Sequence, residues 1–317
     1  MGSAAIECKN LTKYYGKSRG IDGLSLTVER GSTYGFLGPN GAGKTTTIRC
    51  LLGMLQATSG EAFVLGERVK LDGAGLRRRI GYVPGEVKLY EKETGRWHID
   101  YISRFRGGPG SLTGELIERL AFDQGRRVRE LSKGNRQKLA LVLGLMHDPE
   151  LLMLDEPTSG LDPLNQEVVF DIVSERVAAG ATVFLSSHIL SEVERVCTTV
   201  GIIKEGRLVA EDHVESLLRK RLRKLEVTFH EPVGAEALSD VPGVKDITIL
   251  SPRKVAAKVE GEGIDRLLKR LSAYEVDDLV IEHESLEEAF VDYYRKEAVV
   301  GESEADLPDR RKEVDRT

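Results

Sequence analysis

The spacing of hydrophobic and polar side chains changes along the chain and predicts both strands and helices. Residues 5–11 and 24–29 alternate between apolar and polar positions, which indicates two half-buried strands joined by a glycine-containing turn. Apolar residues between 139 and 146 recur at helical spacing, and residues 94–147 are predicted to be largely helical. The pattern therefore predicts an α/β protein with a helical segment of its own.

Two shorter runs, residues 151–154 and 182–186, read as parallel strands buried on both faces. The first run is followed directly by Asp155 and Glu156, and the second ends close to His188. Because ligands bind at the carboxyl ends of such strands, these three side chains are candidates for one site.

A glycine-rich segment follows the apolar run 34–37 and precedes a predicted helix, which is the context that a P-loop requires. It consists of Gly38, Pro39, Asn40, Gly41, Ala42, Gly43, Lys44, Thr45 and Thr46. Glycines let the backbone amides approach an anion, and the helix that begins near Lys44 adds its own unpaired amides. Lys44 can place its charge on the outer phosphates, Thr45 can ligate Mg²⁺, and Thr46 can donate a further hydrogen bond. The segment predicts a nucleoside-triphosphate site.

Next to a P-loop, the two acids gain defined roles. Asp155 suits Mg²⁺, through water, and Glu156 can act as general base on the water that attacks the γ-phosphate. His188 is placed to reach the same phosphate. Tyr15 can stack on a purine, although its local sequence alone favours an ordinary half-buried aromatic at the end of a strand.

Composition narrows the class of protein. The 317 residues suffice for two domains, and a net charge of −5 argues against a nucleic-acid partner. Three widely spaced cysteines predict neither disulfides nor a zinc site and fit a reducing cytosol. No apolar run is long enough to span a bilayer, so we expect any membrane part to belong to another polypeptide.

The C-terminal third alternates strands and helices in the order βαββαβ, which predicts a small ferredoxin-like sandwich. The predicted elements are strand 225–230, helix 233–240, strand 244–250, strand 253–259, helix 263–272 and strand 276–283. A capping box at Ser285 and Glu288 predicts one more helix. Residues 299–317 are charged and are predicted to be disordered.

Several ordered motifs together resemble the ATP-binding domain of an ABC transporter, of the drug-efflux exporter type. In chain order they are Tyr15 at the adenine-stacking position, Gly38 to Thr46 as the Walker A loop, Leu131 to Asn135 as the signature, Leu151 to Glu156 as Walker B, Ser159 to Asp162 as the D-loop, and His188 as the switch histidine. The resemblance covers residues 5 to about 215. It implies a cytoplasmic ATPase that binds ATP and Mg²⁺ and works on the inner face of the membrane with a separate transmembrane permease.

The family also implies a head-to-tail homodimer that closes on two ATP molecules. Ser132 and the amide of Gly134 would then contact the γ-phosphate bound by the partner, and Asp162 would lie at the interface. Catalytic roles fall to Glu156, His188 and Lys44. Two other classes stay open: a soluble ABC ATPase without a permease, and a clamp that binds ATP but hardly hydrolyses it.

This sequence departs from the family pattern at two places. Lys133 and Asn135 replace a glycine and a glutamine of the usual signature, while Ser132 and Gly134 are kept. Gly85 stands where the family has a glutamine that helps to hold Mg²⁺ and the attacking water. Glu86 or water are the candidates to replace it.

The expected fold is thus an α/β P-loop NTPase of the ABC type over residues 1–215. It has a mixed sheet core, an antiparallel β subdomain and a helical subdomain at about residues 86–147. The segment 86–106 is where the family docks its membrane subunit, and within it Trp97 is interpreted as core. Residues 216–298 are expected to form the α+β domain, for dimerisation or regulation.

Overall fold

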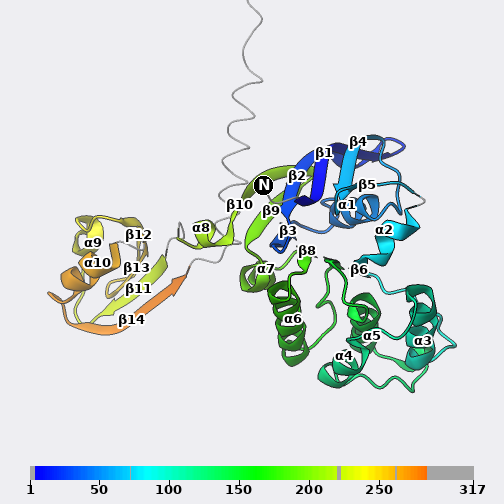
Figure 1. Ribbon diagram of the computed structural model, residues 1–317. Helices are drawn as coiled ribbons and strands as arrows, with labels where there is room; N and C mark the ends of the chain where they lie inside the picture. The colour runs from blue at the N-terminus through cyan, green and yellow to red at the C-terminus, as the bar shows by residue number, and fades with distance from the viewer. Residues whose placement is uncertain (1–3, 72, 220–222, 261–262, 284–317) are drawn as a thin grey trace, which may run out of the picture. The chain divides into compact units, whose positions relative to one another are not determined.

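The computed structural model describes residues 4–71, 73–219, 223–260 and 263–283. The chain divides into two compact units, Met1–Val214 and Glu215–Thr317. Figure 1 shows that both units contain sheets and helices. No helix in the described part of the chain is long and apolar enough to cross a membrane.

A six-stranded sheet forms the centre of the first unit, in the order β10-β9-β3-β8-β7-β6. Its strands are β3 (Thr33–Leu37), β6 (Ile80–Val83), β7 (Leu151–Asp155), β8 (Thr182–Ser187), β9 (Thr199–Lys204) and β10 (Arg207–His213). All neighbours pair in parallel except β10, which is antiparallel to β9. Strands β3, β7 and β8 are buried along their whole length, as their apolar sequences predict.

The register of this sheet brings the predicted site residues to one edge. Leu37 at the end of β3 lies beside Ser187 of β8, and Asp155 at the end of β7 lies beside Ser186. The P-loop, the two acids and His188 all follow these strand ends. The sheet therefore places them together, as expected for parallel strands.

A second, antiparallel sheet has the order β2-β1-β4-β5. Its strands are β1 (Ala4–Tyr15), β2 (Ser18–Glu29), β4 (Ser59–Val64) and β5 (Glu67–Arg68). The buried side chains of β1 and β2 pack with Phe36 and Phe184 of the central sheet in one hydrophobic core. This is the mixed core with an antiparallel β subdomain that the sequence predicts.

Helices of the first unit are α1 (Lys44–Leu51), α2 (Ala74–Arg78), α3 (Gly95–Arg106), α4 (Thr113–Arg119), α5 (Lys133–Leu145), α6 (Pro163–Ala178) and α7 (Leu190–Val196), and α8 (Val214–Arg219) begins at the last residue of this unit. Helices α3 and α4 both pack on α5, and these three form the helical group that the sequence predicts over residues 86–147 (Figure 1). A short 3₁₀ turn at Val128–Glu130 precedes α5. Helices α6 and α7 pack against β8.

In its described residues, the second unit has an antiparallel sheet of order β12-β13-β11-β14 together with helices. Its elements are β11 (Arg223–Phe229), α9 (Glu236–Ser239), β12 (Val244–Ser251), β13 (Lys254–Val259), α10 (Ile264–Leu271) and β14 (Val276–His283). Their succession is the βαββαβ order of the predicted ferredoxin-like sandwich. The helix expected from Ser285, the tail 299–317 and part of the basic run 219–224 lie outside the described residues.

Candidate functional site: a P-loop at the ends of three parallel strands

The P-loop connects β3 to α1, and its backbone is crowded at two of its glycines. Gly43 has a φ of +112°, and a Cβ there would lie 2.5 Å from the carbonyl oxygen of Gly20. A Cβ on Gly38 would lie 2.3 Å from the carbonyl oxygen of Ile203. Only glycine fits these positions, so the loop can curl tightly in front of the N-terminus of α1. This backbone geometry is compatible with the predicted anion cradle.

Within the loop, Pro39, Asn40 and Gly41 are exposed, whereas Ala42 is buried. The amide of Ala42 donates to the carbonyl of Pro39 at 3.1 Å, which closes the turn. Gly41 has a φ of +81°. Its exposed tip leaves the loop open toward solvent, where a nucleotide can enter.

Lys44 is only 5% exposed and lies under the loop. Its Nζ donates to the carbonyl oxygens of Gly38 at 2.6 Å and Pro39 at 3.2 Å, and lies 3.5 Å from Oε1 of Glu156. Burial lowers the pKa of Lys44, and the Glu156 carboxylate partly offsets this effect. A buried ammonium held mainly by neutral carbonyls is well placed to bind an anion.

Glu156 links Lys44 to His188. Its Oε1 lies 3.2 Å from Nδ1 of His188. Glu156 has a φ of +48°, in the left-handed region that is costly for a non-glycine residue. Its amide donates to the carbonyl of Ser186 at 3.0 Å and holds this conformation. The strained turn points the carboxylate of Glu156 toward Lys44 and His188.

Asp155 is 1% exposed and accepts two hydroxyl hydrogen bonds. Thr45 donates to its Oδ2 at 2.8 Å, and Ser186 donates to its Oδ1 at 2.6 Å. A carboxylate with an adjacent hydroxyl fits Mg²⁺, which prefers one or two protein oxygens and completes its shell with phosphate and water. Accordingly, the described residues contain no cluster of three or more His, Cys, Asp or Glu side chains that could hold a metal alone.

Tyr15 lies beside the P-loop. Its ring is 48% exposed, and its hydroxyl is 3.5 Å from Oγ1 of Thr46. A Cβ added to Gly20 would lie 3.0 Å from the ring of Tyr15 and 3.1 Å from the methyl group of Thr46. An exposed aromatic ring at the edge of the loop is available for stacking on a base.

The signature residues lie at the N-terminus of α5, beside the D-loop. Ser132 caps the helix, and its Oγ accepts from the backbone and side-chain amides of Asn135, both at 3.2 Å. Lys133, one of the two departures from the family pattern, donates from Nζ to Oγ of Ser159 at 3.0 Å. A Cβ on Gly134 would lie 2.7 Å from the carbonyl oxygen of Gly160. Gly134 is therefore also required for close packing of the signature against the D-loop.

Asp162 is the N-cap of α6 and accepts from the amide of Asn165 at 3.0 Å, as the sequence predicts, with Pro163 in the first turn. The backbone and side-chain hydrogen bonds from Asn165 lower the pKa of Asp162. Asp162 is exposed on the surface.

The backbone of Gly85 lies against Asp155. A Cβ there would be 3.2 Å from the carbonyl oxygen of Asp155 and 3.5 Å from its Oδ2. Glu86, a candidate to replace the missing glutamine, turns into solvent and lies 3.4 Å from Nζ of Lys88. The structure therefore does not place the Glu86 side chain where the missing glutamine would lie.

Two buried polar residues that support the site were not predicted from the sequence. Ser186 on β8 donates a hydrogen bond to Asp155 on the neighbouring strand β7. Gln137 donates from Nε2 to the carbonyl oxygen of Pro157 at 2.9 Å. Gln137 is 2% exposed. For Ser186, the signal in the sequence was a polar residue at the end of an apolar strand. For Gln137, it was a polar residue on the apolar face of a helix.

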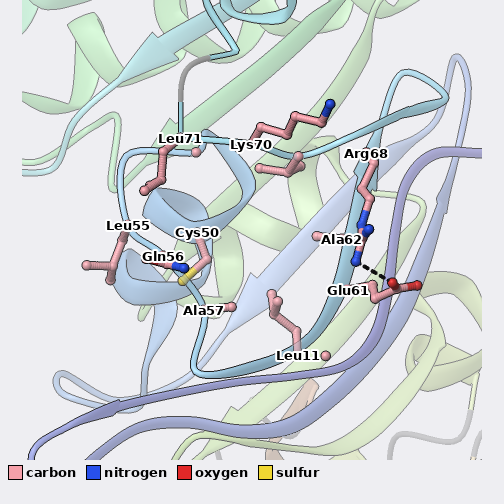
Figure 2. Close-up of a pocket in the computed structure, with 13 residues that line it drawn as sticks. Leu11, Cys50, Leu55, Gln56, Ala57, Glu61, Ala62, Arg68, Lys70 and Leu71 are labelled. Carbon is pink, nitrogen blue, oxygen red and sulfur yellow. Dashed lines mark hydrogen bonds and ion pairs between the residues drawn. The ribbon is translucent and has the colours of Figure 1, made fainter.

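A separate pocket of about 280 Å³ lies between the end of α1 and β4 and β5 (Figure 2). Leu11, Leu55 and Leu71 are among its lining residues, and Arg68 at its rim pairs with Glu61 at 2.5 Å. None of its lining residues belongs to the predicted nucleotide site. The pocket is therefore distinct from the P-loop.

Comparison with known proteins bears directly on this arrangement. The family model described as "ABC transporter" matches residues 21–159. The chain is 39% identical over 245 residues to the bacitracin transport ATP-binding protein of Bacillus licheniformis, covering 75% of this chain and 79% of that protein. It is 32% identical to the Nod factor export ATP-binding protein of Burkholderia orbicola, covering 85% of this chain and 94% of that protein.

Solved structures agree at the level of the fold. An ATP-binding subunit of an ABC transporter superposes with a TM-score of 0.61 at 30% identity, covering 68% of this chain and 92% of that one. A dimeric ATP-binding cassette bound to ADP and phosphate has a TM-score of 0.60 at 21% identity, covering 66% of this chain and 98% of that one. The second likeness, at this lower identity, concerns the fold alone.

Proposed function

Because this chain belongs to the family of ABC transporter ATP-binding proteins, whose domains bind and hydrolyse ATP, we propose that it powers export through a separate transmembrane permease. It would work at the cytoplasmic face of the cell membrane. The observation that carries this proposal is the convergence of Lys44, Thr45, Asp155, Glu156 and His188 at one edge of the sheet. The arrangement combines a phosphate cradle, a metal-binding carboxylate and a base.

In the proposed reaction, each side chain of this cluster has one role. Lys44 leaves the loop carbonyls to bind the outer phosphates, which weakens its attraction to Glu156. Glu156 then accepts a proton from the attacking water, and His188 donates a hydrogen bond toward the γ-phosphate. Thr45 and Asp155 would hold Mg²⁺, which neutralises phosphate charge when bound.

We propose that two copies pair head to tail when they bind ATP. The hydroxyl proton of Ser132 stays available, because its oxygen only accepts in the bonds from Asn135. That proton and the free amides at the start of α5, including that of Gly134, suit a γ-phosphate held by a second copy. Asp162 would lie near the same interface. No nucleic acid takes part.

The permease would dock on an aromatic stripe along α3. Tyr90 and Phe105 are each 60% exposed, and Tyr101 lies between them in a series of ring contacts. Trp97, interpreted from the sequence as core, is only half-buried and stacks on Tyr101 with ring centroids 4.8 Å apart. Exposed contiguous aromatic rings of this kind mark protein interfaces.

The names of the relatives support the proposal of export and the proposed kind of cargo. Those named above carry bacitracin transport and Nod factor export in their names, and another is named a probable multidrug transporter subunit. We therefore assign drugs or other small hydrophobic molecules as cargo. The C-terminal unit would serve dimerisation or regulation.

A resistance assay tests this proposal. The chain would be expressed with the permease encoded beside it in a drug-sensitive host, and growth would be measured against a panel of hydrophobic and peptide antibiotics. We expect resistance to at least one compound with the wild type and none with Glu156→Gln. Turnover of ATP without resistance to any compound, and without binding to the permease, would instead favour a soluble ABC ATPase.

The clamp that hardly hydrolyses ATP keeps one observation in its favour, because Gly85 supplies no side chain to the attacking water. That class predicts tight MgATP binding with equal, negligible turnover in the wild type and Glu156→Gln. Measurements of MgATP binding and ATP turnover with the purified wild type and Glu156→Gln separate this clamp from a transport ATPase.

A further inference from the structure

Glu192 is a buried carboxylate for which the proposed reaction has no role. It lies in the first turn of α7 and is 6% exposed. Across the described ranges, no lysine, arginine or histidine forms an ion pair with it. Burying a charge without a counter-ion is costly unless hydrogen bonds compensate. The partners of Glu192 therefore have to be donors of another kind.

Those donors are two buried hydroxyl groups from two different loops. Thr158 donates from Oγ1 to Oε1 of Glu192, and Ser187 donates from Oγ to Oε2 at 2.5 Å. Thr158 and Ser187 are 4% and 1% exposed. One carboxylate thus bridges the loop after β7 and the loop after β8.

The first loop carries the proposed base. Thr158 is two residues after Glu156, and the amide of Ser159 donates to the carbonyl of Glu156 at 3.1 Å. This turn holds Glu156 in its left-handed conformation. Fixing the Thr158 side chain therefore fixes the turn from which the Glu156 carboxylate projects.

The second loop carries the switch histidine. Ser187 directly precedes His188, and its hydroxyl oxygen also accepts from the amide of Ile189 at 2.8 Å. The residues on both sides of His188 are therefore tied to one hydroxyl group, which Glu192 in turn orients. His188 itself is exposed, and its described contact is the 3.2 Å approach to Glu156.

We propose that Glu192 is a positioning residue that holds the Glu156 and His188 loops at a fixed separation. The inference rests on the proposed hydrolytic roles of those two residues. Glu192 acts through its hydrogen bonds with Thr158 and Ser187. Loss of this bridge should misplace the base relative to the phosphate, and small displacements of this kind slow the chemical step strongly.

Purified full-length variants test the proposal by steady-state ATP turnover, with MgATP affinity measured separately by titration with a fluorescent ATP analogue. Glu192→Ala is expected to lower kcat by about tenfold or more, with affinity within about threefold of the wild type, because the P-loop contacts are untouched. Arg195→Ala is the matched control. Arg195 lies on the same helix as Glu192, and its replacement removes exposed ion pairs with Glu167 and Asp171. It should keep kcat within about twofold, as exposed pairs contribute little.

Glu192→Gln is expected to restore most of the turnover. Its amide oxygen accepts from Thr158, and its amide group donates to Ser187, whose proton can turn to the carbonyl of Ile189 at 3.1 Å. A residue needed only to fill space would not require a side chain that can make both bonds. Turnover in Glu192→Gln as low as in Glu192→Ala would overturn the bridging role.

Thr158→Val and Ser187→Ala test the same bridge if Glu192→Ala does not fold. Each of these variants should lower kcat. Adding Glu192→Gln to either of them should lower kcat no further, because the three residues act as one unit. Wild-type kcat in both hydroxyl variants would overturn this inference alone. A wild type without ATP turnover would overturn the proposed function as well.

Discussion

At the scale of single residues, the chemistry of the site depends on which side chains can move to a ligand. Lys44 is bonded to two loop carbonyls and lies near Glu156, so a triphosphate has to compete only with neutral oxygens and one carboxylate. Asp155 is held more firmly, by two hydroxyl groups. Asp155, the carboxylate proposed to bind the metal, is therefore preorganised, whereas Lys44, the lysine proposed to bind phosphate, is held under the loop by its carbonyls.

Gly85 gives a residue-scale prediction. The Cβ of a glutamine at this position would lie 3.5 Å from Oδ2 of Asp155 and 3.2 Å from its carbonyl oxygen, so the backbone has to shift by a few tenths of an ångström, and the backbone φ does not require glycine. Gly85→Gln should therefore fold and add an amide oxygen near the proposed metal. We expect MgATP affinity to increase by about fivefold, the effect of one added hydrogen bond or ligand of about 1 kcal/mol.

The measurement is nucleotide titration with and without Mg²⁺, with Gly85→Ala as the control for backbone effects. The gain should appear only in the presence of Mg²⁺ and only with glutamine. Equal gains in both variants would mean that stiffening of the loop, and not an added oxygen, is responsible.

The sequence alone identified residues whose type and spacing carry a mechanism, such as Lys44 and the adjacent acids. It did not identify Ser186, Gln137 or Glu192. Each of these is a single polar residue with at least one partner 20 or more residues away along the chain, so that bond depends on register and packing. The interpretation of Trp97 as core failed for a related reason, because helical periodicity does not tell which apolar face is covered.

At the scale of elements, two helix N-termini form the surface proposed to meet a second copy. Ser132 caps α5 and Asp162 caps α6. A cap stabilises the helix by itself, so a change at Ser132 could act through stability or through phosphate binding. Aspartate separates these effects, because it caps as well as serine but repels a γ-phosphate.

We therefore predict that Ser132→Asp keeps the thermal midpoint within a few degrees of the wild type and abolishes ATP-dependent pairing. Light scattering of the Glu156→Gln background with and without MgATP measures the pairing. Ser132→Ala is the comparison: it should lose about 1 kcal/mol of stability through the missing cap. Normal pairing by Ser132→Asp would contradict a phosphate facing Ser132.

A second element-scale prediction concerns the junction between α3 and β6. Arg106, at the end of α3, donates to the carbonyl of Arg78 at 2.7 Å and lies 2.6 Å from Nε2 of His147. Because the guanidinium only donates, His147 must be neutral. Burial and Arg106 lower the pKa of His147 from 6.5 to about 4.

The unfolded chain binds a proton at His147 below pH 6.5, whereas the folded protein does so only near pH 4. Stability from this site is therefore complete above pH 6.5 and is lost as the pH falls toward 4. Urea unfolding should show that His147→Gln reduces the difference in stability between pH 7 and pH 5 by roughly 1 kcal/mol, allowing for partial solvation of the ring.

Most element types could be predicted from periodicity, but their ends could not. β1 and β2 span Ala4–Tyr15 and Ser18–Glu29, longer than the predicted 5–11 and 24–29, because bulges in their pairing break the alternation. Helix α9 covers only Glu236–Ser239 of the predicted 233–240. Strands β7 and β8 were predicted well, since full burial leaves an uninterrupted apolar run.

At the scale of the whole molecule, every residue of the proposed site belongs to the unit Met1–Val214. One copy holds a P-loop with its acids and histidine, and also a signature segment packed against its own D-loop. The two surfaces would meet only between copies. This is why ATP binding, pairing and release are proposed as a single cycle driven by hydrolysis.

The most direct measurement of this account is the ATP turnover of the purified wild type compared with Glu156→Gln. Loss of a general base predicts a fall of at least about 100-fold, with MgATP still bound, because Lys44 and the P-loop are unchanged. Equal turnover in the two proteins, with both folded, would contradict Glu156 as the base and with it the proposed site.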